Sequence, residues 1–447
     1  MIQSEKDKKG DADRMAEIQK ITICPGVELD YHYTDQFKCS SFAVGFKYRV
    51  QTGSSSADTV LSRVICHSSA DYPTPIQFNR RLDELYSAEL TNSSFRAGDF
   101  RFAIFQVTFL NDAFASEIPD FSRAVLSFLS GMILCPNLSG KAAFSETETT
   151  LEKHAIHDRI LAIKNNKRSY AISRIVELMS DESRYEVPDY GTLAEVEKIT
   201  PESLFSRYRE MLYHSEIRFS YVGSLPVGSV LSFVEELFAP ICKPRRPIKG
   251  KLAFSKKKAA VPVRKTVEET DGKQAILCLG YREPIGIEDD DDASVLPLLS
   301  AVLSDCPMSM LFSEVREKHG YCYSIGALLH PSARTMTIYA GIDAENADAV
   351  RRAVKSVLSD LKREKLQDGL FESARSFVRA AILALTDEVE AFAYYVVRRA
   401  LFGWDTDVER MISKTMALSQ SDLARIARKI RPDTVYLLAP KGDMVDG

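Results

Sequence analysis

The chain has 447 residues, of which 45% are hydrophobic and 27% charged, a composition typical of a globular protein that can bury large cores. Its length corresponds to about three typical domains. The formal net charge is −4, from 58 basic and 62 acidic residues, which argues against a nucleic acid or an anionic membrane as a partner.

The first half predicts one α+β domain after a polar lead-in over residues 1–20. β-branched and aromatic runs predict strands, and apolar residues at helical spacing predict helices. Thr200 and Pro201 are expected as the N-cap and first residue of a helix. In chain order the elements are strands at 26–37 and 38–50, helices at 54–69 and 73–90, a strand at 100–110, a mainly helical region at 118–185, a helix at 201–212, a strand at 217–225 and a helix at 229–238.

Residues 239–262 break this pattern, because they are rich in proline and lysine and lack helical periodicity, so they are predicted to form a linker. Strands and helices resume beyond it. The second half predicts a strand at 273–281, helices at 289–305 and 308–320, strands at 321–329 and 335–342, a helix at 347–366, a long helical region and a last strand at 434–440.

The order of elements in the second half resembles that in the first. EVEKITPESLFSRYREML before IRFSYVG matches MISKTMALSQSDLARIARKI before TVYLLAP, and FNRRLDELYSAEL before FLND matches LFSEVREKHGYCYSI before AGID. The matched segments lie about 220–230 residues apart, which indicates a duplicated domain rather than a solenoid. The prediction is an α+β fold of two homologous domains, 21–238 and 263–447, each with a mixed or antiparallel sheet packed with helices.

The eight cysteines are far apart and form no C-x-x-C pair, and several lie in apolar runs. Reduced, buried thiols are therefore predicted. The polar start has no apolar signal region, and no later apolar run is long enough to span a membrane. A cytoplasmic, prokaryotic protein is the expectation.

Residues 315–326, VREKHGYCYSIG, place Arg316 seven positions before Tyr323. A helix should end near Gly320, and alternation along the following strand puts Tyr323 on one face with Tyr321 and Ile325. A guanidinium fork and a phenol hydroxyl could then converge on a developing negative charge. Alternatively, Arg316 is a solvated surface residue and Tyr323 packs in the core.

This run, with GYREPI before it and IYAGIDAENADAV after it, resembles the second domain of the insulinase/pitrilysin-type metallopeptidases, the family of insulysin and mitochondrial processing peptidase. YPTPIQFNRRLDELYSAEL and YGTLAEVEKITPESLFSRYREML resemble the first domain. The resemblance covers nearly the whole chain from about residue 20. It implies a half clamshell of two similar α+β domains, two of which enclose an unfolded peptide.

The family's zinc site uses H-x-x-E-H on a first-domain helix, where two histidines bind the metal and the glutamate activates water, together with a more distant glutamate ligand. Zinc lowers the pKa of bound water to about 7. This chain has neither H-x-x-E-H nor H-E-x-x-H, and Asp58, Leu61 and Ser62 stand near the expected ligand and base positions. His67 has no helical partner, so we expect no zinc, no other cofactor and no unaided hydrolysis.

Other charged or histidine-rich stretches have ordinary structural explanations that we prefer to a binding site. His154 and His157, with Glu152 and Asp158 close by, are expected to be surface residues of a helix, and His319 to lie at a helix C-terminus. Asp289–Asp292 should form an acidic turn before a helix. The basic residues of the linker, Arg245, Arg246 and Lys256–Lys258, should be solvated.

In the family, the residues that match Arg316 and Tyr323 line the catalytic chamber, hydrogen-bond the substrate and stabilise the oxyanion. In split members each half is a separate chain. The resemblance therefore implies a zinc-free subunit of a heterodimeric peptidase that acts on short or unfolded peptides, with a paralogous H-x-x-E-H chain carrying the zinc.

Two other functions are considered. One is an inactive homologue with a role in assembly or peptide holding, like the core proteins of respiratory complexes. The other is peptide maturation or export, with the Arg–Tyr pair serving specificity alone. The sequence departs from the family at Ser304–Cys306, where glycines are frequent, and at Tyr321, where a small aliphatic residue is usual.

Overall fold

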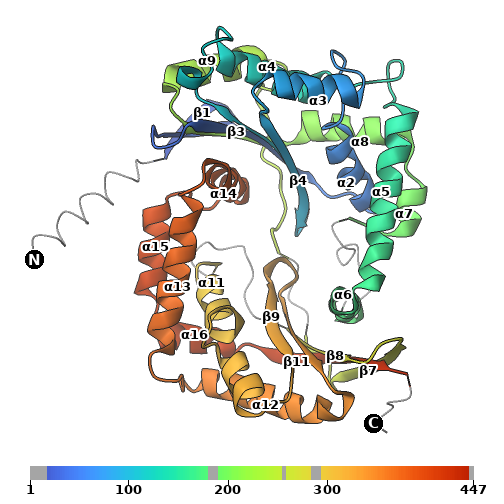
Figure 1. Cartoon of the computed structure of the whole chain (residues 1–447), viewed down its shortest axis with the longest axis vertical. Helices are drawn as coiled ribbons and strands as arrows, with labels where there is room; N and C mark the ends of the chain where they lie inside the picture. The colour runs from blue at the N-terminus through green and yellow to red at the C-terminus, as the bar shows by residue number, and fades with distance from the viewer. Residues whose placement is uncertain (1–17, 180–189, 254–257, 283–292, 442–447) are drawn as a thin grey trace, which may run out of the picture. The chain divides into compact units, whose positions relative to one another are not determined.

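The computed structural model describes residues 18–179, 190–253, 258–282 and 293–441 (Figure 1). They divide into two compact units. The first unit is Met1–Asp158, Asp189–Gly250 and Leu383–Arg410, and the second is Arg159–Pro188, Lys251–Ile382 and Met411–Gly447. Each unit therefore includes a helical segment from the other half of the sequence.

The first unit is built on a six-stranded sheet with the strand order β1-β2-β6-β3-β5-β4. Its strands are β1 (Gln19–Cys24), β2 (Val27–Tyr33), β3 (Cys39–Arg49), β4 (Glu89–Ala97), β5 (Phe100–Leu110) and β6 (Glu216–Gly223). The helices wholly or mainly in this unit are α2 (Ser55–Val64), α3 (Pro75–Glu84), α4 (Phe121–Leu134), α5 (Glu146–Asn165), α7 (Leu193–Glu197), α8 (Pro201–His214), α9 (Val227–Leu237) and α14 (Val389–Phe402), with a 3-10 turn η1 (Asp112–Phe114).

The second unit is built on a five-stranded sheet with the strand order β7-β11-β8-β10-β9. Its strands are β7 (Arg264–Thr270), β8 (Ala275–Arg282), β9 (Ser324–His330), β10 (Thr335–Ile342) and β11 (Arg431–Pro440). Its helices are α6 (Lys167–Met179), α11 (Leu296–Ser300), α12 (Ala347–Lys362), α13 (Leu370–Leu385), α15 (Val408–Ala417) and α16 (Gln420–Ala427), with the short η2 (Ala301–Asp305), η3 (Phe312–Lys318), η4 (Pro331–Ala333) and η5 (Ala344–Asn346).

The two sheets have the same topology, apart from the extra edge strand β1. In each, one parallel pair (β2 with β6, β7 with β11) is followed by three antiparallel pairings in the same order. The helix–strand segments matched in the sequence, α8–β6 with α16–β11 and α3–β4–β5 with η3–β9–β10, occupy corresponding places. The predicted α+β fold of two similar halves is confirmed.

One helix of each unit comes from the other half of the chain. Helix α14 crosses β3 and β6, and α6 crosses β11 and β8, as the colours in Figure 1 make visible. Glycine occupies both crossing points: a Cβ at Gly45 of β3 would lie 2.7 Å from Cδ1 of Leu401, and one at Gly280 of β8 would overlap Sδ of Met179. The matching runs VGFK and LGYR thus mark where a helix approaches each sheet closely.

Helix α8 begins as predicted. Thr200 is its N-cap, accepts a hydrogen bond from the backbone N–H of Ser203, and is followed by Pro201 as the first helical residue. The reciprocal bond from the Thr200 N–H to the Ser203 hydroxyl, 2.9 Å, completes a capping box. This cap fixes the start of the helix that carries Arg207.

Residues 239–250, the start of the predicted linker, lie along the first unit. The Arg245 N–H donates to the Pro25 carbonyl at 2.7 Å, and its guanidinium donates to the carbonyls of Ser215 and Ile241 at 3.2 and 3.0 Å. Arg245 therefore packs rather than extending into solvent, which corrects the expectation of a solvated basic stretch at this residue. The domain boundary at 239–262 stays a prediction, and Asp289–Asp292, Lys256 and Lys257 lie outside the described residues.

A carboxylate on β7 anchors helix α6. Glu268 accepts hydrogen bonds from Arg174 (2.8 and 3.0 Å), Tyr170 (2.9 Å) and, on β11, Tyr436 (3.0 Å). Burial acts to raise the pKa of Glu268, but the bonds from Arg174 and the two tyrosines outweigh burial and lower it.

We expect Glu268→Gln to lower the free energy of unfolding by about 1–2 kcal/mol, because charge-assisted hydrogen bonds are lost at a partly exposed site. A lowered folded-state pKa stabilises the fold above the unfolded value of 4.5, and this contribution is lost as pH falls below it. Urea denaturation at neutral and acidic pH measures both effects. Glu269→Gln, on the exposed neighbour, is the matched control, and equal losses in the two variants would contradict the anchoring role.

Candidate functional site

Helix α2 covers the segment that the sequence predicts to match the family's zinc helix. The three residues expected near the ligand and base positions are all buried, with Asp58 2%, Leu61 1% and Ser62 3% exposed. The Ser62 hydroxyl donates to the Thr59 carbonyl at 2.9 Å within the helix. None of these side chains is free to bind a metal from solvent.

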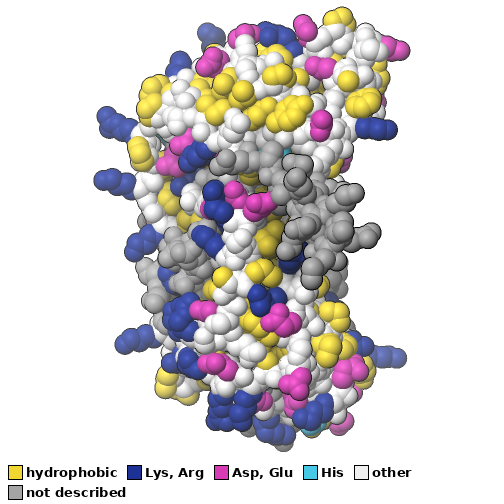
Figure 2. All heavy atoms as spheres, turned by 90° about the vertical axis from the view of Figure 1, so that its left-hand side faces the viewer, with side chains coloured by type: hydrophobic (Ala, Val, Ile, Leu, Met, Phe, Trp, Pro, Cys, Tyr) yellow, Lys and Arg dark blue, Asp and Glu magenta, His cyan; other side chains and the backbone are white. Residues whose placement is uncertain are grey.

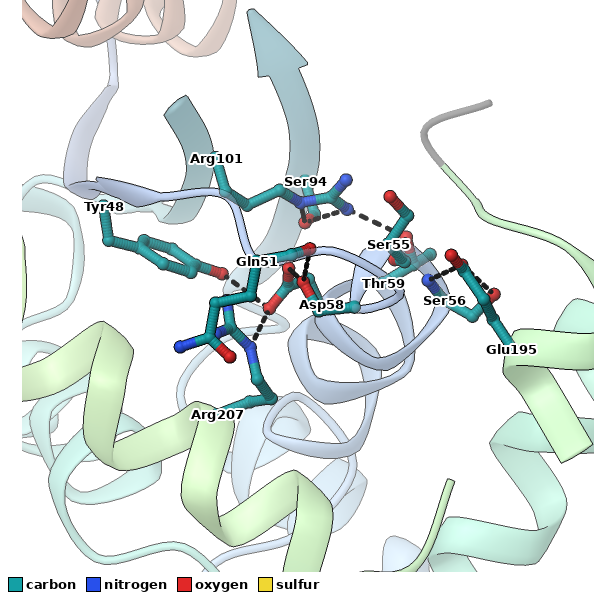
Figure 3. A network of polar contacts seen from close by, with 11 residues as sticks. Tyr48, Gln51, Ser55, Ser56, Asp58, Thr59, Ser94, Arg101, Glu195 and Arg207 are labelled. Carbon is teal, nitrogen blue, oxygen red and sulfur yellow. Dashed lines mark hydrogen bonds and ion pairs between the residues drawn. The ribbon is translucent and has the colours of Figure 1, made fainter. Parts of the chain in front are cut away.

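Asp58 is instead the centre of a buried ion pair (Figure 3). Its Oδ1 accepts from Nε of Arg207 at 2.8 Å and from the Tyr48 hydroxyl at 3.3 Å, and its Oδ2 accepts from the Ser54 hydroxyl at 3.0 Å. The Arg207 guanidinium also lies 5.4 Å from the centroid of the Tyr48 ring. Burial, followed by the charge of Asp58, raises the pKa of Tyr48, so its hydroxyl stays protonated and donates to the carboxylate.

Other polar side chains in the first turns of α2 also have hydrogen-bond partners. Arg101, 1% exposed, donates to the hydroxyls of Ser94 and Thr59 at 2.7–3.0 Å. The Ser56 N–H and hydroxyl donate to Glu195 at 3.2 and 3.3 Å (Figure 3). Two buried arginines therefore take part in the polar contacts of α2: Arg207 pairs with Asp58, and Arg101 bonds to Thr59.

The histidines that the sequence offers as possible metal ligands lie next to acidic residues or at solvent-exposed positions. His67 lies 3.2 Å from Glu152, which also pairs with Arg63. His154 is exposed, and His157 lies 3.3 Å from the neighbouring Asp158. In the part of the chain that the structure describes, no group of three or more metal-binding side chains is found.

The Arg316–Tyr323 segment is the second half of the candidate site. Helix η3, a π-helical stretch, ends at Lys318, and Gly320 has the left-handed backbone (φ +63°) that reverses the chain, as predicted. Strand β9 begins only at Ser324, later than expected. Cys322 is buried and Tyr323 is 59% exposed, so Tyr323 is not a core residue.

Arg316 and Tyr323 are both accessible but have different surroundings. The side chain of Arg316 is 47% exposed, its guanidinium lies 5.0 Å from the Phe312 ring centroid, and its Nε is 4.0 Å from Glu317. The Tyr323 hydroxyl donates to both carboxylate oxygens of Asp343, at 2.9 and 3.0 Å. Within the described residues no hydrogen bond joins Arg316 to Tyr323.

Asp343 and Arg207 are the two partners that the sequence did not reveal. Asp343 follows β10 directly, at the end of the AGID run used to detect the repeat, but nothing in the sequence pairs it with Tyr323. Its hydrogen bond and its charge raise the pKa of Tyr323. Arg207 is 149 residues from Asp58, and no local pattern links the two.

The positions that depart from the family take part in local packing. The rings of Tyr321 and His319 stack with centroids 4.9 Å apart, and His319 Nε2 lies 3.2 Å from Glu314. Cys306 is 3% exposed, and the Ser304 hydroxyl donates to Asp305 at 2.6 Å.

The first unit contains a pocket of about 430 Å³ between β4, β5 and the start of α14. The Ser93 and Tyr394 hydroxyls are 3.1 Å apart there, and the Gln106 amide donates to the Glu390 carbonyl at 2.8 Å. The residues that line it are Thr91, Asn92, Ser93, Ile104, Gln106, Glu388, Glu390, Ala391 and Tyr394. No residue predicted as catalytic is among them.

On the face drawn in Figure 2, basic and acidic side chains are interspersed with apolar ones. Among the described residues, no helix combines the length and apolar character needed to cross a bilayer.

Comparison with known proteins points to one family. Residues 198–378 match the family described as "Peptidase M16 inactive domain". The chain is 20% identical over 405 residues to "Probable inactive metalloprotease YmfF" of Bacillus subtilis (strain 168), an alignment that covers 91% of this chain and 94% of YmfF.

Two solved structures share the fold. A conserved protein from Enterococcus faecalis V583 superposes with a TM-score of 0.84 at 20% identity, over 96% of this chain and all of that one (100%). A peptidase M16 inactive domain from Pseudomonas fluorescens superposes with a TM-score of 0.76 at 15% identity, over 95% of this chain and 98% of that one. The resemblance to the insulinase/pitrilysin-type peptidases is confirmed: the chain is similar to inactive M16 peptidase homologues, and its sequence contains no H-x-x-E-H.

Proposed function

We propose that this chain is the zinc-free subunit of a heterodimeric M16 metallopeptidase and has no peptidase activity by itself. Arg316 and Tyr323 then bind the substrate and stabilise the oxyanion opposite a paralogous chain that carries H-x-x-E-H and the zinc. The substrates are short or unfolded peptides, and the complex acts in the cytoplasm of a bacterium.

The observation that carries this proposal is an asymmetry between two segments of the same chain. Helix α2 has no histidine and contains a buried aspartate paired with Arg207, whereas Arg316 in η3 and Tyr323 before β9 are accessible. An accessible guanidinium and phenol hydroxyl are donors of the kind that stabilise a developing oxyanion. The cysteines support a reducing compartment, because all eight are free thiols.

The alternative is an inactive homologue that assembles with other proteins or holds peptides. Two observations favour it. The chain is similar to YmfF, which is described as a probable inactive metalloprotease, and the Tyr323 hydroxyl already donates a hydrogen bond to Asp343. The two functions differ in whether cleavage by a zinc-bearing partner depends on Arg316.

The proposal predicts the location of the metal. We expect the purified chain to contain no stoichiometric zinc, because Asp58, Leu61 and Ser62 are buried and provide no imidazole. A complex with an H-x-x-E-H paralogue of the same genome should contain one zinc per pair of chains. Size-exclusion chromatography with elemental analysis measures both quantities.

Stoichiometric zinc in the isolated chain at neutral pH would overturn the zinc-free assignment. Failure of every H-x-x-E-H paralogue of that genome to form a complex with the chain would overturn the heterodimer.

A further inference from the structure

The Tyr323 hydroxyl and the Asp343 carboxylate are held together by the backbone. The Tyr323 N–H donates to the Gly341 carbonyl at 2.8 Å, which sets Tyr323 beside the end of β10. Asp343 is the first residue after that strand. Tyr323 directly precedes β9 and Asp343 directly follows β10, so their contact lies at the end of the β9–β10 pairing.

A phenol hydroxyl has a single proton to donate. Here both oxygens of Asp343 lie within 3.0 Å of it, so the proton is directed at a carboxylate. Such charge-assisted bonds are roughly twice as strong as those to a neutral acceptor. A substrate carbonyl oxygen would have to compete with Asp343 for the same proton.

We propose that Asp343 is a positioning residue that keeps the Tyr323 proton away from the substrate and so limits the contribution of Tyr323 to oxyanion stabilisation. This inference rests on the proposed function of the shared site. Arg316 then provides the larger part, because its guanidinium has five N–H donors and its nearest carboxylate contact, Glu317, is 4.0 Å from Nε.

The first test uses the isolated chain, labelled with tyrosine carrying ¹³C at the ring carbon that bears the hydroxyl, and follows the Tyr323 signal by NMR during a pH titration. Tyr323→Phe assigns the signal. Asp343→Asn should lower the pKa of Tyr323, because it removes the charge and the strong acceptor. Asp348→Asn, a nearby exposed aspartate, is the control that should leave this pKa unchanged.

Asp343→Asn should leave the fold intact, because Asp343 is exposed and makes no side-chain capping bond to η5. An identical Tyr323 titration in wild type and Asp343→Asn overturns the inference. This arm needs neither a partner chain nor catalysis, so its failure is distinguishable from failure of the proposed function.

The second test is a double-mutant cycle on the heterodimer with the H-x-x-E-H paralogue. Tyr323→Phe should reduce kcat less than about tenfold when Asp343 is present, but by about 10²–10³ in the Asp343→Asn background, where no carboxylate competes for the proton of the hydroxyl. Asp343→Asn alone should raise kcat. Equal effects of Tyr323→Phe in both backgrounds, or a lower kcat in Asp343→Asn, contradict the inference.

Discussion

Replacing Asp58 by alanine should lower the free energy of unfolding by about 3–5 kcal/mol, because it leaves a buried arginine without its counter-charge. Asp58 and Arg207 have side chains 1% and 6% exposed and are joined at 2.8 Å. Within the described chain, Nη1 and Nη2 of Arg207 are buried and have no hydrogen-bond partner, so Asp58 is the main group that compensates its charge.

Urea denaturation of the full chain measures the loss, and an exposed pair gives the matched control. Asp348 lies 2.9 Å from Arg351, but their side chains are 69% and 41% exposed, so Asp348→Ala should cost less than about 1 kcal/mol. A second variant tests the cause of the loss: Asp58→Leu with Arg207→Met should recover most of it, because an apolar pair removes both charges. Equal losses for Asp58→Ala and Asp348→Ala would contradict this account of α2.

Replacing Arg316 by alanine should reduce kcat of the assembled heterodimer by about 10²–10³, the usual effect of removing one oxyanion donor. The guanidinium is half-exposed and lies against Phe312, so its removal should not unfold the segment. Arg316→Lys should give an intermediate rate, because an ammonium keeps the charge but loses the planar fork of donors.

Peptide hydrolysis by the purified complex measures this loss, with the zinc content of each variant checked in parallel. Arg351→Ala, which removes a similarly exposed arginine from α12, is the control and should retain the wild-type rate. A rate for Arg316→Ala equal to that of Arg351→Ala would remove Arg316 from the site and favour the assembly function.

The fold followed from the sequence wherever its signals are local. Hydrophobic periodicity and turn residues gave most of the helices and strands, and Thr200 with Pro201 gave the start of α8. The edge strands β1, β4 and β7 were not predicted. The repeat also followed, because duplicated segments keep the same order of elements. The exchange of α6 and α14 between the two halves did not, since their apolar faces do not indicate which sheet they cover.

The candidate site was predictable only in part, for the same physical reason. The absence of H-x-x-E-H and the spacing of Arg316 and Tyr323 are properties of short segments. The partners that decide how these segments behave, Arg207 for Asp58 and Asp343 for Tyr323, are brought close by tertiary packing alone. The sequence showed that the H-x-x-E-H motif is missing, but not the ion pair between Asp58 and Arg207.

The central claim, that this chain supplies one half of a shared peptidase site, is tested most directly by peptide cleavage with separately purified chains. An unstructured peptide should be hydrolysed only when this chain and its H-x-x-E-H paralogue are mixed, with the rate rising until the two are equimolar. If the paralogue alone cleaves the peptide as fast as the mixture, this chain contributes nothing to the site and the claim is wrong.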